Sequence, residues 1–279
     1  MSYFNTSLIG IERIPQAPSA CLIVLHGLAE HCGRYEAPIA AIAASGIACF
    51  AYDQRGHGRS PGARADIEHF SQYADDFATI RAGISARYPR LPIFLWGHSL
   101  GSIVAVCSAL DQRNLLAGVI TTGCPVCAVP GWSSPLPVWG FARKVAATLP
   151  TLRVRPGLPV EALSHDVKVQ RDYLQDPLVQ EKVSVRLLVE LGNACVSVLQ
   201  QAPSIRVPWL AVHGAEDSIA PPQGSQRLVA RLSSSDKQLL MQPGLFHEVH
   251  NEAEPAASQF RELLSDWIRA RTEPLHTDN

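Results

Sequence analysis

The sequence carries almost no net charge, since 24 Lys and Arg residues stand against 25 Asp and Glu, giving −1. Proteins that bind nucleic acid electrostatically need a strongly basic face, so this balance argues against a nucleic-acid partner. No stretch reaches the roughly 20 apolar residues of a membrane span. Residues 1–6 also lack the basic start and apolar run of a signal peptide, so we expect a cytoplasmic protein.

Cysteine is present only as an odd, scattered set of seven residues. Such a set does not form a disulfide framework, so we expect small core residues in a reducing compartment, namely Cys21, Cys49 and Cys107. Cys124 and Cys127 form a single C-x-x-C with no second pair, and His247 and His250 lack the i, i+4 spacing of a zinc-binding helix. The sequence therefore predicts no metal and no cofactor.

The most informative segment is Gly-His-Ser-Leu-Gly at 97–101, which lies between an apolar strand candidate and an apolar helix candidate. G-x-S-x-G in this context forms a nucleophile elbow. The glycines are needed because an abrupt strand-to-helix turn leaves no room for side chains two residues on either side of the serine. The pattern predicts that Ser99 is a nucleophile at a helix N-terminus, where backbone N–H groups favour negative charge.

A serine hydroxyl is a weak nucleophile that needs a base, and the base needs an orienting acid. A strand candidate over 207–212 leads into Glu216 and Asp217, at the rim where parallel strands of an open sheet end. Both acids are candidates, and Asp217 is the preferred one. The next strand candidate leads to His247, the preferred base, with His250 as the alternative.

An oxyanion hole needs two backbone N–H donors. One is expected from Leu100, after the serine, and the other from Leu28, with Ala29 as second choice, in the loop after a strand over 21–25. Gly27 allows this loop to approach the serine closely. Two histidines are expected to hold the loop by hydrogen bonds: His26 and His31.

Five motifs in order resemble one family: H-G-x-x-E-H-x-x-R-Y over 26–35, D-x-R-G-H-G-x-S over 53–60, and the three segments around the serine, acid and base. The chain resembles monoacylglycerol lipases and the related bacterial lysophospholipases, α/β-hydrolases of the serine aminopeptidase S33 (hydrolase 4) type. The resemblance implies a triad of Ser99, Asp217 and His247, and oxyanion donors at Leu28 and Leu100. One departure is Ser102 in place of a glycine, which we expect to narrow the pocket floor.

Short apolar strands alternate with helical patterns, which predicts a mostly parallel sheet covered on both faces, the α/β-hydrolase fold. Strand candidates lie at 21–25, 47–52, 93–96, 118–122, 207–212 and 238–241. Apolar residues at steps of three and four predict helices over 70–84 and 260–268.

The alternation stops between residues 123 and 203, where prolines are frequent and no strand is clear. We expect a core made of 1–122 and 204–272, a helical cap over 123–203, and a disordered tail over 273–279. Helices are expected over 139–149 and 183–198. Three aromatic residues are expected to line an acyl-chain tunnel under this cap, namely Trp132, Trp139 and Phe141. Four basic residues form at most a weak patch, which leaves weak contact of the cap with a membrane surface open: Arg143, Lys144, Arg153 and Arg155.

The sequence therefore predicts a serine hydrolase that cleaves a lipid ester, a monoacylglycerol or lysophospholipid, through an acyl-enzyme. A carboxylesterase, thioesterase or acyltransferase acting on smaller acyl groups is the alternative, because the cap selects the substrate. A non-catalytic α/β-hydrolase binding scaffold is disfavoured, because the serine, the acid and the histidine are all present. The sequence does not indicate an oligomeric state.

Overall fold

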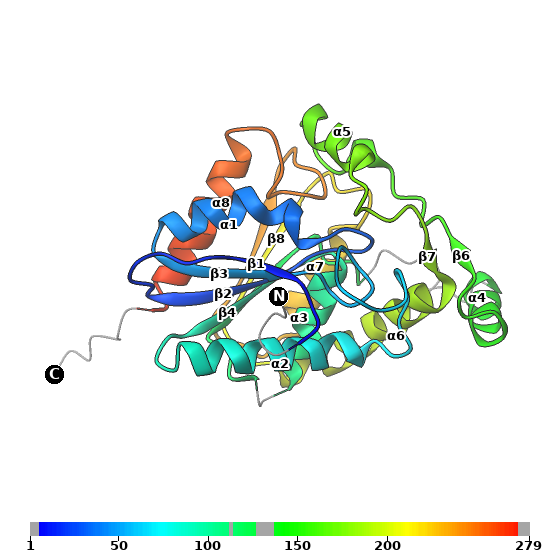
Figure 1. Ribbon diagram of the computed structural model, residues 1–279, viewed down its shortest axis with the longest axis horizontal. Coiled ribbons are helices and arrows are strands. Elements are labelled where there is room, and N and C mark those ends of the chain that lie inside the picture. The colour runs from blue at the N-terminus through cyan, green and yellow to red at the C-terminus, as the bar shows by residue number, and fades with distance from the viewer. Residues whose placement is uncertain (1–5, 112–113, 127–136, 273–279) are drawn as a thin grey trace.

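The computed structural model describes residues 6–111, 114–126 and 137–272, with helices on both faces of one central sheet (Figure 1). The sheet has seven strands in the order β1-β3-β2-β4-β5-β8-β9. All neighbouring strands are parallel except β1 and β3. The bounds are β1 (Gly10–Arg13), β2 (Ala20–Leu25), β3 (Ile47–Tyr52), β4 (Ile93–His98), β5 (Gly118–Thr122), β8 (Trp209–Gly214) and β9 (Lys237–Gln242). The predicted mostly parallel sheet is confirmed.

The helices form one layer on each side of the sheet (Figure 1). Helices α1 (Glu36–Ala44) and α8 (Ala256–Arg269) cover one face, and α2 (Ser71–Arg87), α3 (Leu100–Leu110) and α7 (Gln223–Arg231) cover the other. The short helix η1 (Cys32–Tyr35) precedes α1. Helices α2 and α8 confirm the two helices that the apolar spacing predicts.

Successive residues of the central strands alternate between two cores. In β2, Leu22 and Val24 pack with α1 and α8, whereas Ile23 and Leu25 pack with α2 and α3. All four side chains are buried. Because both faces are covered, the strands are apolar along their whole length, which is why the sequence predicts them well.

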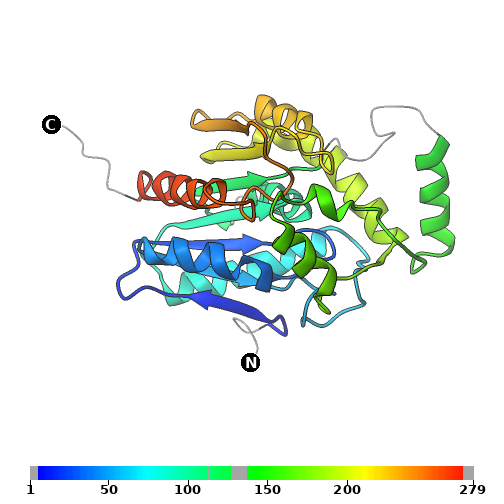
Figure 2. The same ribbon diagram turned by 90° about the horizontal axis from the view of Figure 1, so that it is seen from above.

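Residues 123–208, between β5 and β8, are a segment that we call the insertion. It contains α4 (Pro137–Thr148), η3 (Val160–Ala162), α5 (Val167–Gln175), α6 (Val185–Gln201) and η4 (Ala202–Ser204). Helix α6 packs on α3, and α4 packs on the far side of α6, away from the sheet (Figures 1 and 2). Within the described residues, no helix combines the length and the apolar character needed to cross a membrane.

The fold differs from the expectation at β1, at α5 and at a strand pair in the insertion. Strand β1 was not predicted, because it is a half-buried edge strand with charged residues. Helix α5 was not predicted, because none of its residues is buried. The insertion was expected to lack strands, but β6 (Arg153–Val154) and β7 (Val183–Ser184) pair antiparallel, and two residues are too short to leave a periodic pattern. The expected tail, 273–279, lies outside the described residues.

Candidate active site

Ser99 lies at a sharp turn between β4 and α3. Its backbone has φ 51° and ψ −119°, a left-handed conformation that is strained for a residue with a side chain. A Cβ atom on Gly97 would lie 2.2 Å from the Gly101 carbonyl oxygen, and one on Gly101 would lie 2.3 Å from the Leu25 carbonyl oxygen. The structure therefore gives the physical reason for both glycines of the motif.

The close contact at Gly101 leads to a stability prediction. Gly101→Ala forces a methyl group onto the backbone of β2, so we expect it to lower the free energy of unfolding by about 1–3 kcal/mol or more. Gly140→Ala is the matched control, because a Cβ atom at this position in α4 meets nothing within 4 Å. We expect the control to raise stability by up to about 1 kcal/mol. Urea denaturation measures both, and equal effects would contradict this reading of the elbow.

Asp217 and His247 meet in a buried pair at the rim of the sheet. His247 Nδ1 donates to Asp217 Oδ2 over 2.7 Å, and Asp217 Oδ1 accepts from the N–H groups of Ile219 and Ala220 at 2.9 and 2.8 Å. Burial alone raises the pKa of Asp217, but the facing His247 and the donated hydrogen bonds hold it well below its usual range. Burial lowers the pKa of His247, yet the Asp217 charge raises it overall. Glu216 is exposed, so the structure brings Asp217 rather than Glu216 to His247.

A second histidine binds the same carboxylate, and the sequence reasoning missed it. His213 is fully buried at the end of β8, and its Nε2 donates to Asp217 Oδ2 over 3.0 Å. Its Nδ1 contacts Ser225 Oγ of α7 at 2.7 Å. The sequence feature that could have identified His213 is its position at the end of a predicted strand, four residues before the acid.

His250, the alternative base, lies in a turn before α8, and among the described residues the histidines that hydrogen-bond to Asp217 are His213 and His247. Its ring stacks on Tyr35 at 4.8 Å and lies 4.8 Å from the ring of His98. Neither ring nitrogen has a hydrogen-bond partner among the described residues. Burial lowers the pKa of His250 to about 4, so the side chain is a neutral packing group.

The loop after β2 approaches Ser99 as the sequence predicts. A Cβ atom on Gly27 would lie 3.2 Å from the Cβ atom of Ser99. His26 Nδ1 donates to the Gly27 carbonyl oxygen over 2.8 Å, while its Nε2 accepts from the Gln54 N–H at 2.9 Å. His26 therefore holds the loop against the turn after β3, which confirms its predicted structural role.

His31 holds the other end of this loop. Its Nδ1 accepts from the Gly33 N–H over 3.1 Å, and its Nε2 contacts Asp176 Oδ2 at 2.7 Å. Asp176 directly follows α5, so His31 joins the loop to the insertion. This contact confirms a structural role for His31 as well.

A cavity of about 240 Å³ lies in front of Ser99 and His247. Leu28 of the predicted oxyanion hole lines it, and Leu100 follows Ser99 as the first residue of α3. The insertion contributes mainly apolar lining residues: Pro156, Leu158, Pro159, Leu163, Tyr173, Leu188, Leu191 and Cys195. The cavity is thus bounded on one side by Ser99 and His247 and on the other side by the insertion.

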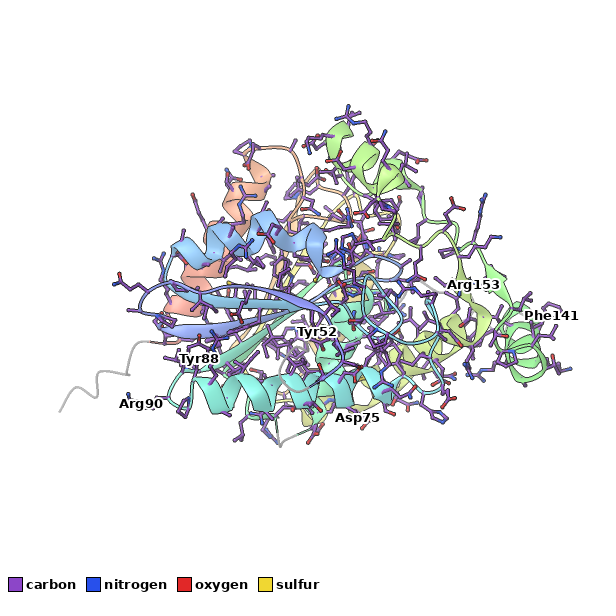
Figure 3. The ribbon with its side chains drawn as sticks, viewed as in Figure 1. Tyr52, Asp75, Tyr88, Arg90, Phe141 and Arg153 are labelled. Carbon is purple, nitrogen blue, oxygen red and sulfur yellow. The ribbon has the colours of Figure 1, made fainter. Side chains whose placement is uncertain are left out.

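Of the three aromatic residues expected in the acyl-chain site, the two that the structure describes are not part of this lining. Phe141 is 69% exposed and lies at the outer end of the molecule on α4 (Figure 3). Trp139 lies on the same helix and is absent from the described cavity wall, and Trp132 lies outside the described residues. The reason is the position of α4, which α6 separates from the sheet. Ser102 is also absent from the wall, because it is buried and its hydroxyl donates to the Ser99 carbonyl over 2.6 Å.

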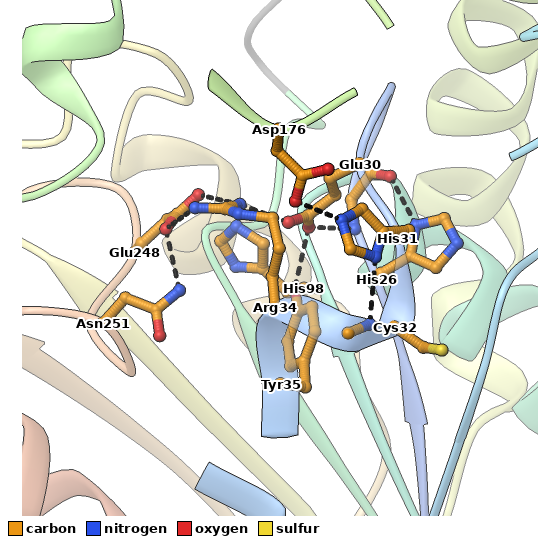
Figure 4. A network of polar contacts seen from close by, with 12 residues as sticks. His26, Glu30, His31, Cys32, Arg34, Tyr35, His98, Asp176, Glu248 and Asn251 are labelled. Atoms are coloured by element: carbon orange, nitrogen blue, oxygen red, sulfur yellow. Dashed lines mark hydrogen bonds and ion pairs between the residues drawn. The ribbon is translucent and has the colours of Figure 1, made fainter. Parts of the chain in front are cut away.

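Three buried charged residues lie beside the cavity, and we call them the clamp: Glu30, Arg34 and Glu248 (Figure 4). Arg34 donates two hydrogen bonds to Glu248, at 2.6 and 2.7 Å, and one to Glu30 Oε2. Glu30 Oε1 accepts from the Gly27 N–H and from the Tyr35 hydroxyl. The sequence reasoning assigned no role to Arg34 or Glu248, whose positions are 214 residues apart.

A strained serine at a helix N-terminus, with a buried His–Asp pair on the same rim, defines a serine hydrolase of the α/β-hydrolase fold. Residues 16–254 match the family model described as serine aminopeptidase, S33, and the chain belongs to this family. It is an ester hydrolase, as its relatives are.

The relatives cover nearly the whole chain. A monoacylglycerol lipase of Mycolicibacterium smegmatis is 36% identical over 90% of this chain and 88% of its own length. Phospholipase YtpA of Bacillus subtilis is 30% identical over 85% of this chain and 91% of its own. The crystal structure of Paleococcus ferrophilus monoacylglycerol lipase is 26% identical, with a TM-score of 0.85 over 95% of this chain and 99% of that one.

Proposed function

We propose that the protein hydrolyses esters of long acyl chains with neutral alcohols, monoacylglycerols in particular. The observation that carries this proposal is the cavity in front of Ser99, with apolar walls from the insertion and the clamp beside it. The similarity to monoacylglycerol lipases supports the same substrate class.

In the proposed mechanism, Ser99 Oγ attacks the ester carbonyl carbon while His247 Nε2 accepts its proton. Asp217 holds the imidazole in the tautomer that exposes Nε2, because it accepts the Nδ1 hydrogen at 2.7 Å. The tetrahedral oxyanion accepts hydrogen bonds from the N–H groups of Leu28 and Leu100. The intermediate collapses, and His247 returns the proton to the leaving alcohol. A water molecule activated by His247 then hydrolyses the acyl-enzyme and frees Ser99.

The charges around the cavity favour a neutral alcohol over a phosphate ester. Arg34 is the one lysine or arginine among the described lining residues, and its guanidinium is bonded to Glu30 and Glu248. These three groups sum to an excess of one negative charge, with no free cation to receive a phosphate. A phosphodiester brought near them is repelled by about 4 kcal/mol at 4 Å in an effective dielectric constant of 20.

Comparing two substrates of equal acyl chain tests this selectivity. We expect kcat/KM for a monoacylglycerol to exceed that for the matching lysophosphatidylglycerol, whose only charge is the phosphodiester, by at least about tenfold, which corresponds to ~1.4 kcal/mol. Similar values for both would favour the phospholipase activity in the name of the Bacillus subtilis relative. Hydrolysis of acetate esters alone would favour a small-ester carboxylesterase.

We propose further that the insertion acts as a cap whose α6 side chains contact the acyl chain. Leu188 and Leu191 of this helix line the cavity. Burying a methylene contributes about 0.8 kcal/mol, so kcat/KM should rise up to about fourfold with each added CH₂ until the cavity is full.

This proposal predicts a selective effect of Leu188→Ala. We expect kcat/KM to fall several-fold for long-chain p-nitrophenyl esters and to change little for the acetate, because only a long chain reaches α6. Val196→Ala is the matched control, since Val196 lies on the same helix but is 38% exposed. A wild-type kcat/KM that does not change with chain length would contradict the proposal, and so would an equal loss at every chain length in Leu188→Ala. Either result would mean that the insertion only packs on the core and does not contact the acyl chain.

We also propose weak contact between the cap and a lipid surface. Phe141 on α4 and Leu174 on α5 are 69% and 71% exposed, and Arg143 lies on α4. The contact is weak because the nearby arginines have partners: Arg143 donates to Asn193, and Arg155 pairs with Glu181.

We propose a cytoplasmic location for the protein, which the free thiols of the described cysteines support.

A further inference from the structure

The clamp joins the two loops that the proposed mechanism uses. Glu30 belongs to the loop after β2 and binds the N–H of Gly27, next to the predicted oxyanion donor Leu28. Glu248 directly follows His247. Arg34, in η1, donates to both carboxylates and is the only described side chain that hydrogen-bonds to both Glu30 and Glu248 (Figure 4).

The clamp is almost fully buried, so its charged groups must be paired with one another in a well-defined geometry. The side chains of Arg34, Glu30 and Glu248 are 9%, 4% and 2% exposed. Removing charges from water costs several kcal/mol per ion, and apolar residues of similar volume often stabilise a fold equally well. The stability of the fold is therefore a poor explanation for a buried cation between two carboxylates. The clamp instead fixes geometry. A planar guanidinium that donates two parallel hydrogen bonds to a carboxylate sets both the distance and the orientation between the two side chains.

Helix α5 covers the clamp from the side of the insertion. The Arg34 guanidinium lies over the Tyr173 ring, 4.8 Å from its centroid, and Asp176 binds His31 at 2.7 Å. Asn251 Nδ2 donates to Glu248 Oε2 over 2.9 Å. These contacts limit the positions that Arg34 and Glu248 can take, so movement of either loop would require breaking several charge-assisted hydrogen bonds.

We propose that Arg34 is a positioning residue that, by bridging Glu30 and Glu248, holds the oxyanion loop and the His247 loop at the spacing that catalysis requires. The inference rests on the proposed function, because the two loops matter only if Leu28 and His247 act on an ester bound at Ser99. Arg34 acts through its neighbours and does not touch the reacting atoms.

The first test is Arg34→Lys, which keeps the positive charge and removes the planar fork. Losing one oxyanion donor costs about 10²–10³ in kcat in other serine enzymes, so a displaced donor should cost about 10–100-fold. We expect this loss in kcat, with KM for a p-nitrophenyl ester changed less than threefold, because the acyl-chain wall is untouched.

Arg271→Lys is the matched control. Arg271 also makes two hydrogen bonds to one carboxylate, Asp236, at 2.8 and 2.6 Å, and its guanidinium lies 3.9 Å from the Trp267 ring centroid. Asp236 directly precedes β9, at the amino ends of the parallel strands, whereas the site lies at their carboxyl ends. We expect Arg271→Lys to leave kcat unchanged. Equal kcat values for Arg34→Lys and the wild type, or a change confined to KM, would overturn the proposal.

The second test is Glu248→Gln, which keeps the shape of the side chain and removes its charge. The charged and titratable groups around His247 are Asp217, His98, His213, His250, Glu30, Arg34 and Glu248 itself. Burial lowers the pKa of His247, and the negative charges of Asp217, Glu248 and Glu30 raise it. The base acts in its neutral form, so kcat/KM rises as pH increases through this pKa.

Glu248→Gln should therefore move the acid limb of kcat/KM to lower pH, in addition to lowering the plateau of kcat. The position of the limb reports the lost charge, whereas the plateau reports positioning. A plateau of kcat per active site equal to that of the wild type would therefore overturn the proposal even if Arg34→Lys fails to fold. Titration of active sites with a fluorophosphonate corrects kcat for folded enzyme. A wild-type protein that hydrolyses no ester would refute the proposed function, whereas an active wild type with insensitive variants would refute this inference alone.

Discussion

Ser99→Ala is expected to reduce kcat for ester hydrolysis by about 10⁶, the scale seen when the nucleophile of another serine hydrolase is removed. The reason is that no other hydroxyl lies at the elbow: Ser102, the nearest in sequence, is buried and donates to the Ser99 carbonyl. Hydrolysis of a monoacylglycerol under saturating conditions gives the measurement.

The variant should keep its fold, because alanine fits the same backbone position and removes one oxygen atom that lies at the cavity. An unchanged unfolding temperature is the control. Retention of more than about a thousandth of the wild-type kcat would contradict the assignment, because losses of the nucleophile in related chemistry are far larger.

Asp217→Asn is expected to lower kcat by about 10⁴, the cost of the same change in a related triad, because an amide favours the wrong imidazole tautomer. Asp217 Oδ2 accepts from His247 Nδ1, and an asparagine nitrogen at that position cannot. Single-turnover kinetics measure the effect without product release.

Glu216→Gln is the matched control for this change. Glu216 neighbours Asp217 in sequence, but it is exposed, and Asp217 is the carboxylate that binds His247. We expect kcat to stay within about twofold of wild type, as surface substitutions change little. The reverse ranking, with Glu216→Gln the more damaging change, would move the orienting acid to Glu216 and leave the nucleophile assignment unaffected.

The sequence predicted the five central strands well, because they are buried on both faces and so form mostly apolar runs. It also predicted one rim for Ser99, Asp217 and His247, since all three follow parallel strands. In the structure Asp217 binds His247, and Ser99 and His247 line the same cavity. Proximity at the ends of parallel strands is a consequence of topology and needs no knowledge of side-chain packing.

The sequence predicted the insertion less well, because its packing depends on contacts between distant segments. Aromatic content suggested α4 as the wall of the substrate site, but α6 separates that helix from the sheet, and Phe141 faces outward (Figure 3). The helix that covers the clamp, α5, is only nine residues long and none of them is buried, so nothing in its sequence indicated that it belongs to the site.

The clamp was missed for a related reason. Glu30 and Arg34 are four residues apart and visible as a pair, but Glu248 reaches Arg34 only after the chain has completed the sheet. An acidic residue directly after the predicted base was the available signal. Its partner could be identified only from the three-dimensional structure.

Mass spectrometry of the fluorophosphonate-labelled protein tests the central claim most directly. The account predicts one adduct, on the peptide that carries Ser99, with hydrolysis of monoacylglycerol lost in proportion to labelling. It also predicts that Ser99→Ala takes up no label. An adduct on a different residue, or full hydrolysis by protein completely labelled at Ser99, would contradict the account.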